Sequence, residues 1–140
     1  MSLFQVFDIA GSGMSAQAIR LNTVSSNMAN AKNVSGTPED IYRSKNPVFQ
    51  SVMRELTGGN TDTSGTGVQV LRIDESQADG QKLYNPNNPM ADKEGYVYQS
   101  NVNVIEEMAN MISASRSYQN NVEVLNTAKQ LLNATIRLGE

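Results

Sequence analysis

The sequence predicts a mainly α-helical protein with a small β-rich domain in the middle, in which long N- and C-terminal helices pair as a coiled coil and short strands lie between them. Apolar residues at both ends of the chain recur in steps of three and four. The chain from residue 101 onward contains no Gly or Pro before Gly139. Between these ends, turn residues alternate with short β-branched and aromatic runs.

The N-terminal region, residues 1–31, begins with a capping box, in which Ser2 and Gln5 satisfy free backbone donors. The predicted helix seam combines large and small side chains at heptad spacing: Phe7, Met14, Ala18, Leu21 and Met28, with Gly11 and Ser25 at the remaining positions. Gly11 and Gly13 each reduce helix stability by about 1 kcal/mol relative to Ala. This helix is therefore poorly suited to standing alone in water.

The middle region, residues 32–100, consists of loops and short strands. Runs that favour β-structure lie at 47–52, 67–73, 82–84 and 95–98, and turn-rich stretches at 35–38, 57–67 and 85–89 separate them. Val68 and Val70 alternate, whereas Leu71 and Ile73 shift the phase, which predicts a β-bulge. The region predicts a small β-rich outer domain, too small for an enclosed active site.

The C-terminal region, residues 101–140, predicts a helix of about 35 residues and about 50 Å. Asn103 can cap it, and Glu106 and Glu107 suit the positive end of the helix dipole. Its predicted seam runs through Val104, Met108, Met111, Ser115, Tyr118, Val122, Leu125, Lys129, Leu132 and Ile136. Without a partner nothing buries this seam, so we expect the terminal helices to be mobile in the free subunit and to order on assembly.

Composition weighs against several functions. The chain has no Cys and no His, which removes the thiolate nucleophile and the commonest general base and metal ligand. A net charge of −3 opposes nucleic-acid binding. No secretory signal and no run of about 18 apolar residues is present, so we expect no direct membrane insertion. We predict no catalytic, cofactor-binding or metal-binding residues, no cofactor and no enzymatic activity.

Uncharged polar side chains gather at the end of the first helix and along the last. They are Thr23, Ser26, Asn27, Asn30 and Asn33, then Asn103, Asn110, Asn120, Asn121 and Asn126. A solvated face usually carries Lys and Glu instead, whereas amides can enter an interface by hydrogen bonding across it. We therefore favour interface use for them, with a solvated polar face as the alternative.

Several motifs carry a resemblance to a known family. Residues 25–31, Ser-Ser-Asn-Met-Ala-Asn-Ala, resemble the Asn-rich N-terminal signature of bacterial flagellar rod and hook axial proteins. Further similar blocks are Phe-Asp-Ile-Ala-Gly-Ser at 7–12, Pro-Val-Phe-Gln at 47–50, Asn-Val-Asn-Val at 101–104 and Ser-Ala-Ser-Arg-Ser-Tyr-Gln at 113–119. The match spans nearly the whole chain, and the C-terminal block is the most specific.

The resemblance implies a structural subunit of the proximal rod of the flagellar basal body. In it, helices 1–31 and 101–140 would form the axial core, and 32–100 the outer domain. It implies assembly in the periplasm with copies of itself and with the rod proteins FlgB and FlgF, after export by the flagellar type III apparatus without a cleaved signal peptide. The assembly interface we expect comprises Phe7, Met14, Ala18, Leu21, Asn27, Met28, Asn30, Val104, Met108, Met111, Tyr118, Val122, Leu125, Leu132 and Ile136.

Three alternatives remain open. Another rod or hook-type axial subunit would share these motifs, although hook-type proteins carry larger outer domains. A membrane-active helical effector secreted by a type III system would need a basic polar face, which these helices lack. A peptidoglycan-cutting enzyme would need a catalytic Glu beside a sugar-binding cleft.

Overall fold

A computed structural model of the chain describes residues 3–54 and 65–138. The helices are α1 (Leu3–Asn30) and α2 (Val104–Leu138), and the strands are β1 (Val34–Ser35), β2 (Lys45–Arg54), β3 (Gly65–Glu75), β4 (Gln81–Tyr84) and β5 (Tyr96–Gln99). The described part is mainly helical, with two long terminal helices and a few antiparallel strands in the middle, as predicted. The predicted capping residue Ser2 and the helix stop at Gly139 lie outside the described residues.

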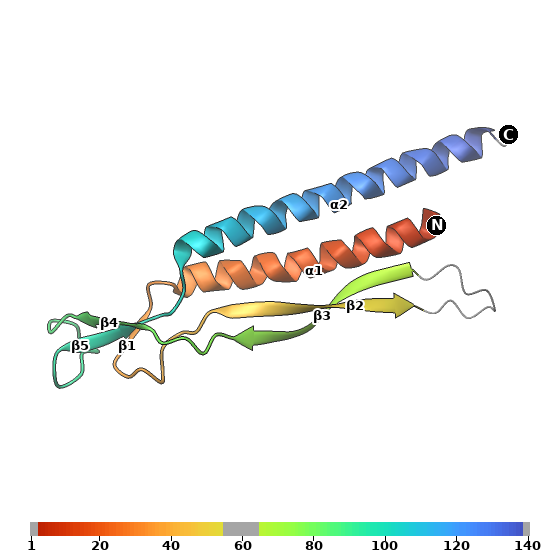
Figure 1. Cartoon of the computed structure of the whole chain (residues 1–140). Coiled ribbons are helices and arrows are strands. Elements are labelled where there is room, and N and C mark those ends of the chain that lie inside the picture. Colours follow the sequence, from red (N-terminus) through yellow and green to blue (C-terminus); the bar gives the residue numbers. More distant parts are fainter. Residues whose placement is uncertain (1–2, 55–64, 139–140) are drawn as a thin grey trace.

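The elements form an elongated stack in which α1 is the central layer (Figure 1). α2 runs antiparallel along one side of α1, and the long hairpin of β2 and β3 runs along another side. Of the described helices and strands, α2 packs against α1 only. α2 also continues past the start of α1, so the two helices do not end level (Figure 1).

The start of α2 agrees with the sequence prediction. The side-chain oxygen of Asn103 accepts hydrogen bonds from the backbone N–H groups of Ile105 at 3.1 Å and Glu106 at 3.5 Å. Two acidic residues lie in the first turn, and Arg137 lies in the last turn. Both placements oppose the charge of the adjacent helix end. The predicted N-cap is therefore confirmed.

The hairpin of β2 and β3 contains the predicted bulge. Val48 pairs with Arg72 and Phe49 pairs with Val70, which leaves Leu71 as the extra residue on β3. Both strands are longer than predicted, because pairing extends from Lys45 opposite Glu75 to Arg54 opposite Gly65. A cross-strand ladder prolongs a strand beyond the residues whose own propensity favours β-structure.

The hairpin is joined to α1 by a side-chain hydroxyl. The Oγ atom of Ser12 accepts a hydrogen bond from the backbone N–H of Val68 at 3.1 Å and donates one to the carbonyl oxygen of Ile9 at 2.8 Å. A Cβ atom added at Gly67 would lie 3.2 Å from the same hydroxyl oxygen. The absence of a side chain at Gly67 thus lets β3 approach α1 closely.

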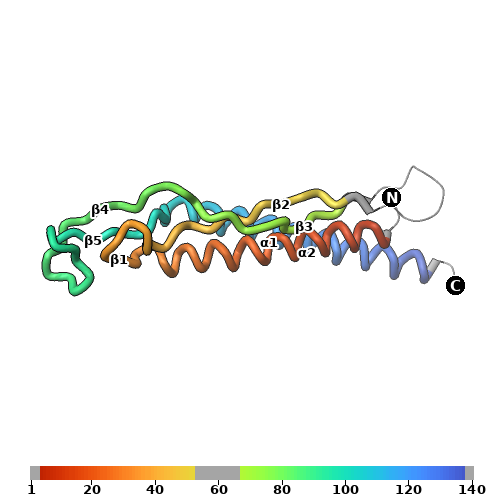
Figure 2. Tube along the Cα trace, turned by 90° about the horizontal axis from the view of Figure 1, so that it is seen from below, coloured from red at the N-terminus to blue at the C-terminus, as the bar shows by residue number. Residues whose placement is uncertain are grey.

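A second, smaller sheet lies beyond the C-terminal end of α1 (Figure 2). β5 is its central strand, with β1 and β4 paired antiparallel on either side. Val97 of β5 is 2% exposed and forms its core. Gly95 before β5 has a φ of 84°, a left-handed conformation that favours glycine. The sequence analysis does not predict β1, because a two-residue strand is defined only by its distant partner.

Candidate assembly interface

α1 and α2 keep one register over two heptads. Two pairs of positions define it: Asn27 beside Glu107, and Gly13 against Asn121. From position 13 to 27 of α1 and from position 107 to 121 of α2, the separation is the same, 14 residues or two heptads. The antiparallel helices therefore keep one register between these two pairs.

Several side chains at this helix contact are small. Ala114 is 0% exposed and Ala128 is 4% exposed. A Cβ atom added at Gly13 would come within 2.9 Å of the side-chain nitrogen of Asn121. Small side chains allow two helix axes to approach closely. The contact is therefore narrow and leaves no room for large apolar residues at its centre.

One close approach between the helices lies beside the predicted seam. Gly13 faces Asn121 there, and each stands one residue before a seam position, Met14 or Val122. One residue turns a side chain by about 100° around a helix axis. Met14 and Val122 are themselves half-buried, and the seam stays a prediction. The predicted seam omits the heptad spacing of residues 107, 114, 121 and 128, three of which are buried.

The predicted interface residues fall into three groups by exposure. Eleven are half-buried: Phe7, Met14, Ala18, Leu21, Met28, Asn30, Met111, Tyr118, Val122, Leu125 and Leu132. Val104, Met108 and Ile136 are exposed, and Asn27 is fully buried. Most of these side chains thus lie beside the helix pair with part of their surface open.

α2 also carries large apolar side chains on its solvent-exposed surface. Ile105 is 80% exposed, Met108 is 50% exposed and Ile112 is 56% exposed. Their spacing of three and four residues places them on one face of the helix. Of the three, the sequence analysis predicts only Met108. We call Ile105, Met108 and Ile112 the outer row.

A groove follows the helix pair near its other end. Val6 of α1 and six residues of α2 line this space of about 460 Å³: Asn120, Glu123, Val124, Thr127, Ala128 and Leu131. Val124 is 46% exposed and Leu131 is 56% exposed. Apolar surface is therefore open at both ends of α2.

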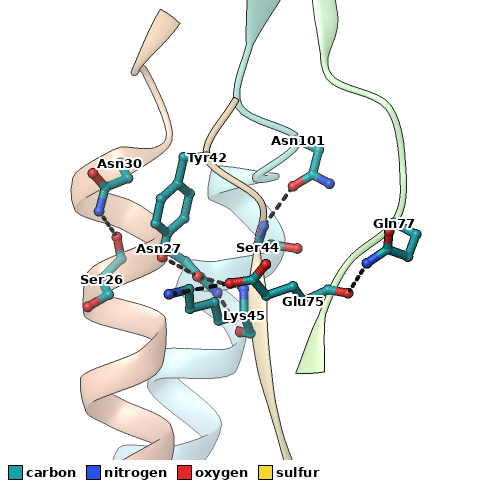
Figure 3. Close-up of polar contacts among 9 residues, drawn as sticks. All are labelled: Ser26, Asn27, Asn30, Tyr42, Ser44, Lys45, Glu75, Gln77 and Asn101. Carbon is teal, nitrogen blue, oxygen red and sulfur yellow. Dashed lines mark hydrogen bonds and ion pairs between the residues drawn. The ribbon is translucent and has the colours of Figure 1, made fainter. Parts of the chain in front are cut away.

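Asn27 joins α1 to the start of β2 (Figure 3). Its side-chain oxygen accepts hydrogen bonds from the backbone N–H of Lys45 at 2.9 Å and from the Tyr42 hydroxyl at 3.0 Å. Its side-chain nitrogen donates to the carbonyl oxygen of Lys45 at 2.8 Å. Burial raises the pKa of the Tyr42 hydroxyl. The amide of Asn27 thus acts inside the subunit.

Other amide side chains among the uncharged polar residues predicted for the interface also form hydrogen bonds within the subunit. Asn110 accepts a hydrogen bond from the Arg20 guanidinium at 2.9 Å, which links the two helices. Asn30 donates to the carbonyl oxygen of Ser26 at 2.8 Å (Figure 3). Asn101, which the sequence analysis does not include among these polar side chains, accepts from the backbone N–H of Ser44 at 2.7 Å. These bonds fix α1, α2 and the hairpin relative to one another.

Glu107 is a buried carboxylate at the junction of α1 and α2. It is 5% exposed, and its Oε2 atom has no hydrogen-bond partner among the described residues. Burial raises the pKa of this carboxyl, and the neighbouring Asn27 amide opposes that rise. From the sequence, Glu107 is predicted only to compensate the helix dipole. Its burial depends on packing beside Asn27, which is distant in the sequence.

Two further features bear on function. Within residues 3–54 and 65–138, neither helix combines the length and hydropathy that a membrane span requires. The same ranges contain no group of three or more His, Cys, Asp or Glu side chains placed to hold a metal ion.

Comparison with known proteins identifies the family. Residues 7–36 match the family described as "Flagella basal body rod protein", and residues 93–138 match "Flagellar basal body rod FlgEFG protein C-terminal". The flagellar basal-body rod protein FlgC of Escherichia coli O157:H7 is 49% identical over 140 residues, and that of Yersinia enterocolitica is 50% identical over 142. FlgC of Bacillus subtilis is 34% identical over 151 residues. Each alignment covers 100% of both chains.

The matched segments contain all of α2, including the outer row, and α1 from residue 7 onward. The chain therefore belongs to the FlgC family of flagellar basal-body rod proteins, and it is a structural rod subunit.

Proposed function

We propose that the chain polymerises into the proximal rod through the outer surfaces of its two helices, and that the assembled rod transmits torque through this helix packing. The observation that carries the proposal is the outer row, three large apolar side chains at least half exposed on one helix face. Contiguous exposed apolar patches mark interaction sites on soluble proteins. The half-buried side chains of the predicted interface would enlarge this apolar surface. Asn27 would contribute indirectly, through its hydrogen bonds inside the subunit.

We further propose that α1 and α2 pair as a coiled coil. The seven-residue register between them supports this, because heptad spacing keeps the same faces of two helices in contact over many turns. The contact differs from a Leu-rich seam in its small side chains, Ala114 and Ala128. A narrow contact of this kind leaves the larger apolar residues free for neighbouring subunits.

The partners we propose are copies of the same chain, the rod proteins FlgB and FlgF, and the flagellar type III export apparatus. The subunit would leave the cytoplasm without a cleaved signal peptide and assemble in the periplasm. The names of the relatives, all flagellar basal-body rod proteins, support the location in the rod. We propose no enzymatic activity.

The proposal is tested by placing a charge in the outer row. Ile112→Asp should leave the stability of the free subunit within about 0.5 kcal/mol, because the side chain is exposed. The same change should abolish swimming when it replaces the wild-type chain in a deletion strain, because assembly would bury the carboxylate. The measurements are urea unfolding of the purified chain, swimming in soft agar and electron microscopy of basal bodies.

Ile112→Leu is the matched control, since it keeps the apolar surface and should swim normally. Normal rods and normal swimming in the Ile112→Asp strain would show that the outer row is not buried on assembly.

A further inference from the structure

The buried carboxylate of Glu107 takes no part in the proposed assembly through the outer row. Glu107 lies in the first turn of α2 and is 5% exposed. Its Oε2 atom is buried without a hydrogen-bond partner among the described residues. A buried carboxylate that lacks full hydrogen bonding favours its neutral, protonated form.

The nearby cations are engaged elsewhere. The Arg20 guanidinium of α1 donates to the Oδ1 atom of Asn110, one turn further along α2. The Lys45 ammonium lies 3.5 Å from the carboxylate of Glu75. No ion pair to Glu107 is present in the part of the chain that the structure describes. Its negative charge is therefore incompletely compensated.

The other groups around Glu107 give it little further compensation. On its own helix, the negative charge of Glu106 favours protonation. From α1, the Arg20 charge and the Asn27 amide favour the ionised form. From the segment before β2, the Tyr42 hydroxyl interacts with Glu107, and the Lys45 and Glu75 charges act on the same hydroxyl. Burial outweighs the favourable contributions, so the net direction for Glu107 is toward the neutral form.

The position of Glu107 connects its charge to three elements. Asn27 beside it is 0% exposed, and both functional groups of its amide bond to the start of β2. A change at Glu107 therefore acts on the contact between α1 and α2 and, through Asn27, on the hairpin. We propose that Glu107 makes this junction acid-stabilised: uptake of a proton by its carboxyl tightens the packing of α1, α2 and β2, and loss of the proton loosens it.

The direction of the pH dependence follows from linkage. The carboxyl of Glu107 has a pKa in the folded chain above its ordinary value of 4.5, so the folded chain binds more protons at this site. Its stabilising contribution is complete below about pH 4.5. It is lost as the pH rises through the folded-state pKa, and stability from this group is lowest above that point.

The experiment compares the full chain with Glu107→Gln by urea unfolding from pH 4.5 to pH 8. Glutamine has the same shape and stays neutral. At pH 8 the unfolding equilibrium constant of Glu107→Gln should be at least about fivefold smaller than that of the wild type. The two should converge toward pH 4.5, where the wild-type carboxyl is protonated.

Glu106→Gln is the matched control, because it removes a charge from the same helical turn at an exposed position. It should retain the direction of the wild-type pH dependence with a smaller size, because the Glu106 charge that favours protonation of Glu107 is removed. Parallel pH profiles for wild type and Glu107→Gln, or a Glu107→Gln chain that is less stable at every pH, would overturn the proposal.

A direct measurement covers the case in which Glu107→Gln does not fold. Carbon-13 NMR of the wild-type chain labelled at Glu carboxyl groups should show one carboxyl that titrates at higher pH than the others, and Glu107→Asp should remove or shift that signal. Titration of every Glu carboxyl near the ordinary value would contradict the proposal.

Discussion

The two helices of this subunit differ in how much of each is covered. Among the described helices and strands, α1 packs against α2 and against both strands of the hairpin, whereas α2 packs against α1 only. Of the side chains whose burial the structure describes, five in α1 are buried: Ala10, Ala16, Thr23, Val24 and Asn27. The longer α2 has three such side chains: Glu107, Ala114 and Ala128. α1 is therefore a core element of the subunit, and most of the described surface of α2 is left open.

This difference has an energetic consequence. A change in α1 should alter the stability of the free subunit, because its side chains make internal contacts. A change on the open faces of α2 should alter assembly and leave the free subunit nearly unchanged. Five substitutions test this division, in addition to those proposed for Ile112 and Glu107: three main variants, two of which have a comparison variant.

The largest effect is expected for Asn27→Ala. This substitution removes the bonds to the backbone N–H and carbonyl of Lys45 and to the Tyr42 hydroxyl, and leaves those groups without their partner. We expect a loss of about 2–4 kcal/mol in unfolding free energy, since each buried unsatisfied polar group costs about 1–3 kcal/mol. Urea unfolding measures it.

Asn30→Ala is the control for that substitution. Its side-chain nitrogen donates to the carbonyl oxygen of Ser26 within the same helix, at an exposed site. It should cost less than about 1 kcal/mol. Equal losses of unfolding free energy for Asn27→Ala and Asn30→Ala would show that the buried hydrogen bonds of Asn27 stabilise the subunit no more than an exposed bond does.

A smaller effect is expected for Gly13→Leu. The added side chain would meet Asn121 across the narrow contact and push α2 away from α1. Overpacking of this kind costs about 1–3 kcal/mol. Thermal or urea unfolding should show this loss, and Gly13→Leu combined with Asn121→Ala should recover part of it.

Gly11→Ala, in the same helical turn, is expected to raise the free energy of unfolding, whereas Gly13→Leu is expected to lower it. An added Cβ atom at Gly11 meets nothing within 4 Å. The helix should gain up to about 1 kcal/mol from the better propensity of Ala. Destabilisation by Gly11→Ala would show that position 11, like position 13, has no room for a side chain.

The smallest effect is expected for Ile136→Ala at the end of α2. Ile136 is 58% exposed and lies in the last turn of α2. Its loss should change the unfolding free energy by less than about 0.5 kcal/mol. A loss as large as that of Gly13→Leu would show that the end of α2 is covered within the free subunit.

Local signals in the sequence are sufficient for most of the secondary structure. The cap at Asn103 and the bulge at Leu71 depend on residues within a few positions, and both are found. The placement of the hairpin along α1 depends on the contact of Ser12 with Val68, which no local pattern reveals. β1 is missed for the same reason.

The helix contact shows what a search for large side chains leaves out. Large apolar residues such as Met14 and Val122 suggest a seam, and the neighbouring Gly13 and Asn121 also meet closely across the two helices. The sequence alone does not tell whether a large residue faces its own partner helix or a neighbouring subunit. The ordering of the terminal helices on assembly stays a prediction, and the losses expected above for Asn27→Ala and Gly13→Leu in the free subunit would contradict it. The residues of the assembly interface also stay predictions.

The unequal helix lengths affect how subunits can be joined. α2 has 35 residues and α1 has 28, and α2 projects past the start of α1. At 1.5 Å per residue the difference is about 10 Å, or two helical turns. If subunits assemble through their helices as proposed, the projecting end of α2 would overlap a helix of the neighbouring subunit. A twisting load would then act as shear along the overlapping helices, and helices that end level would meet only at their ends.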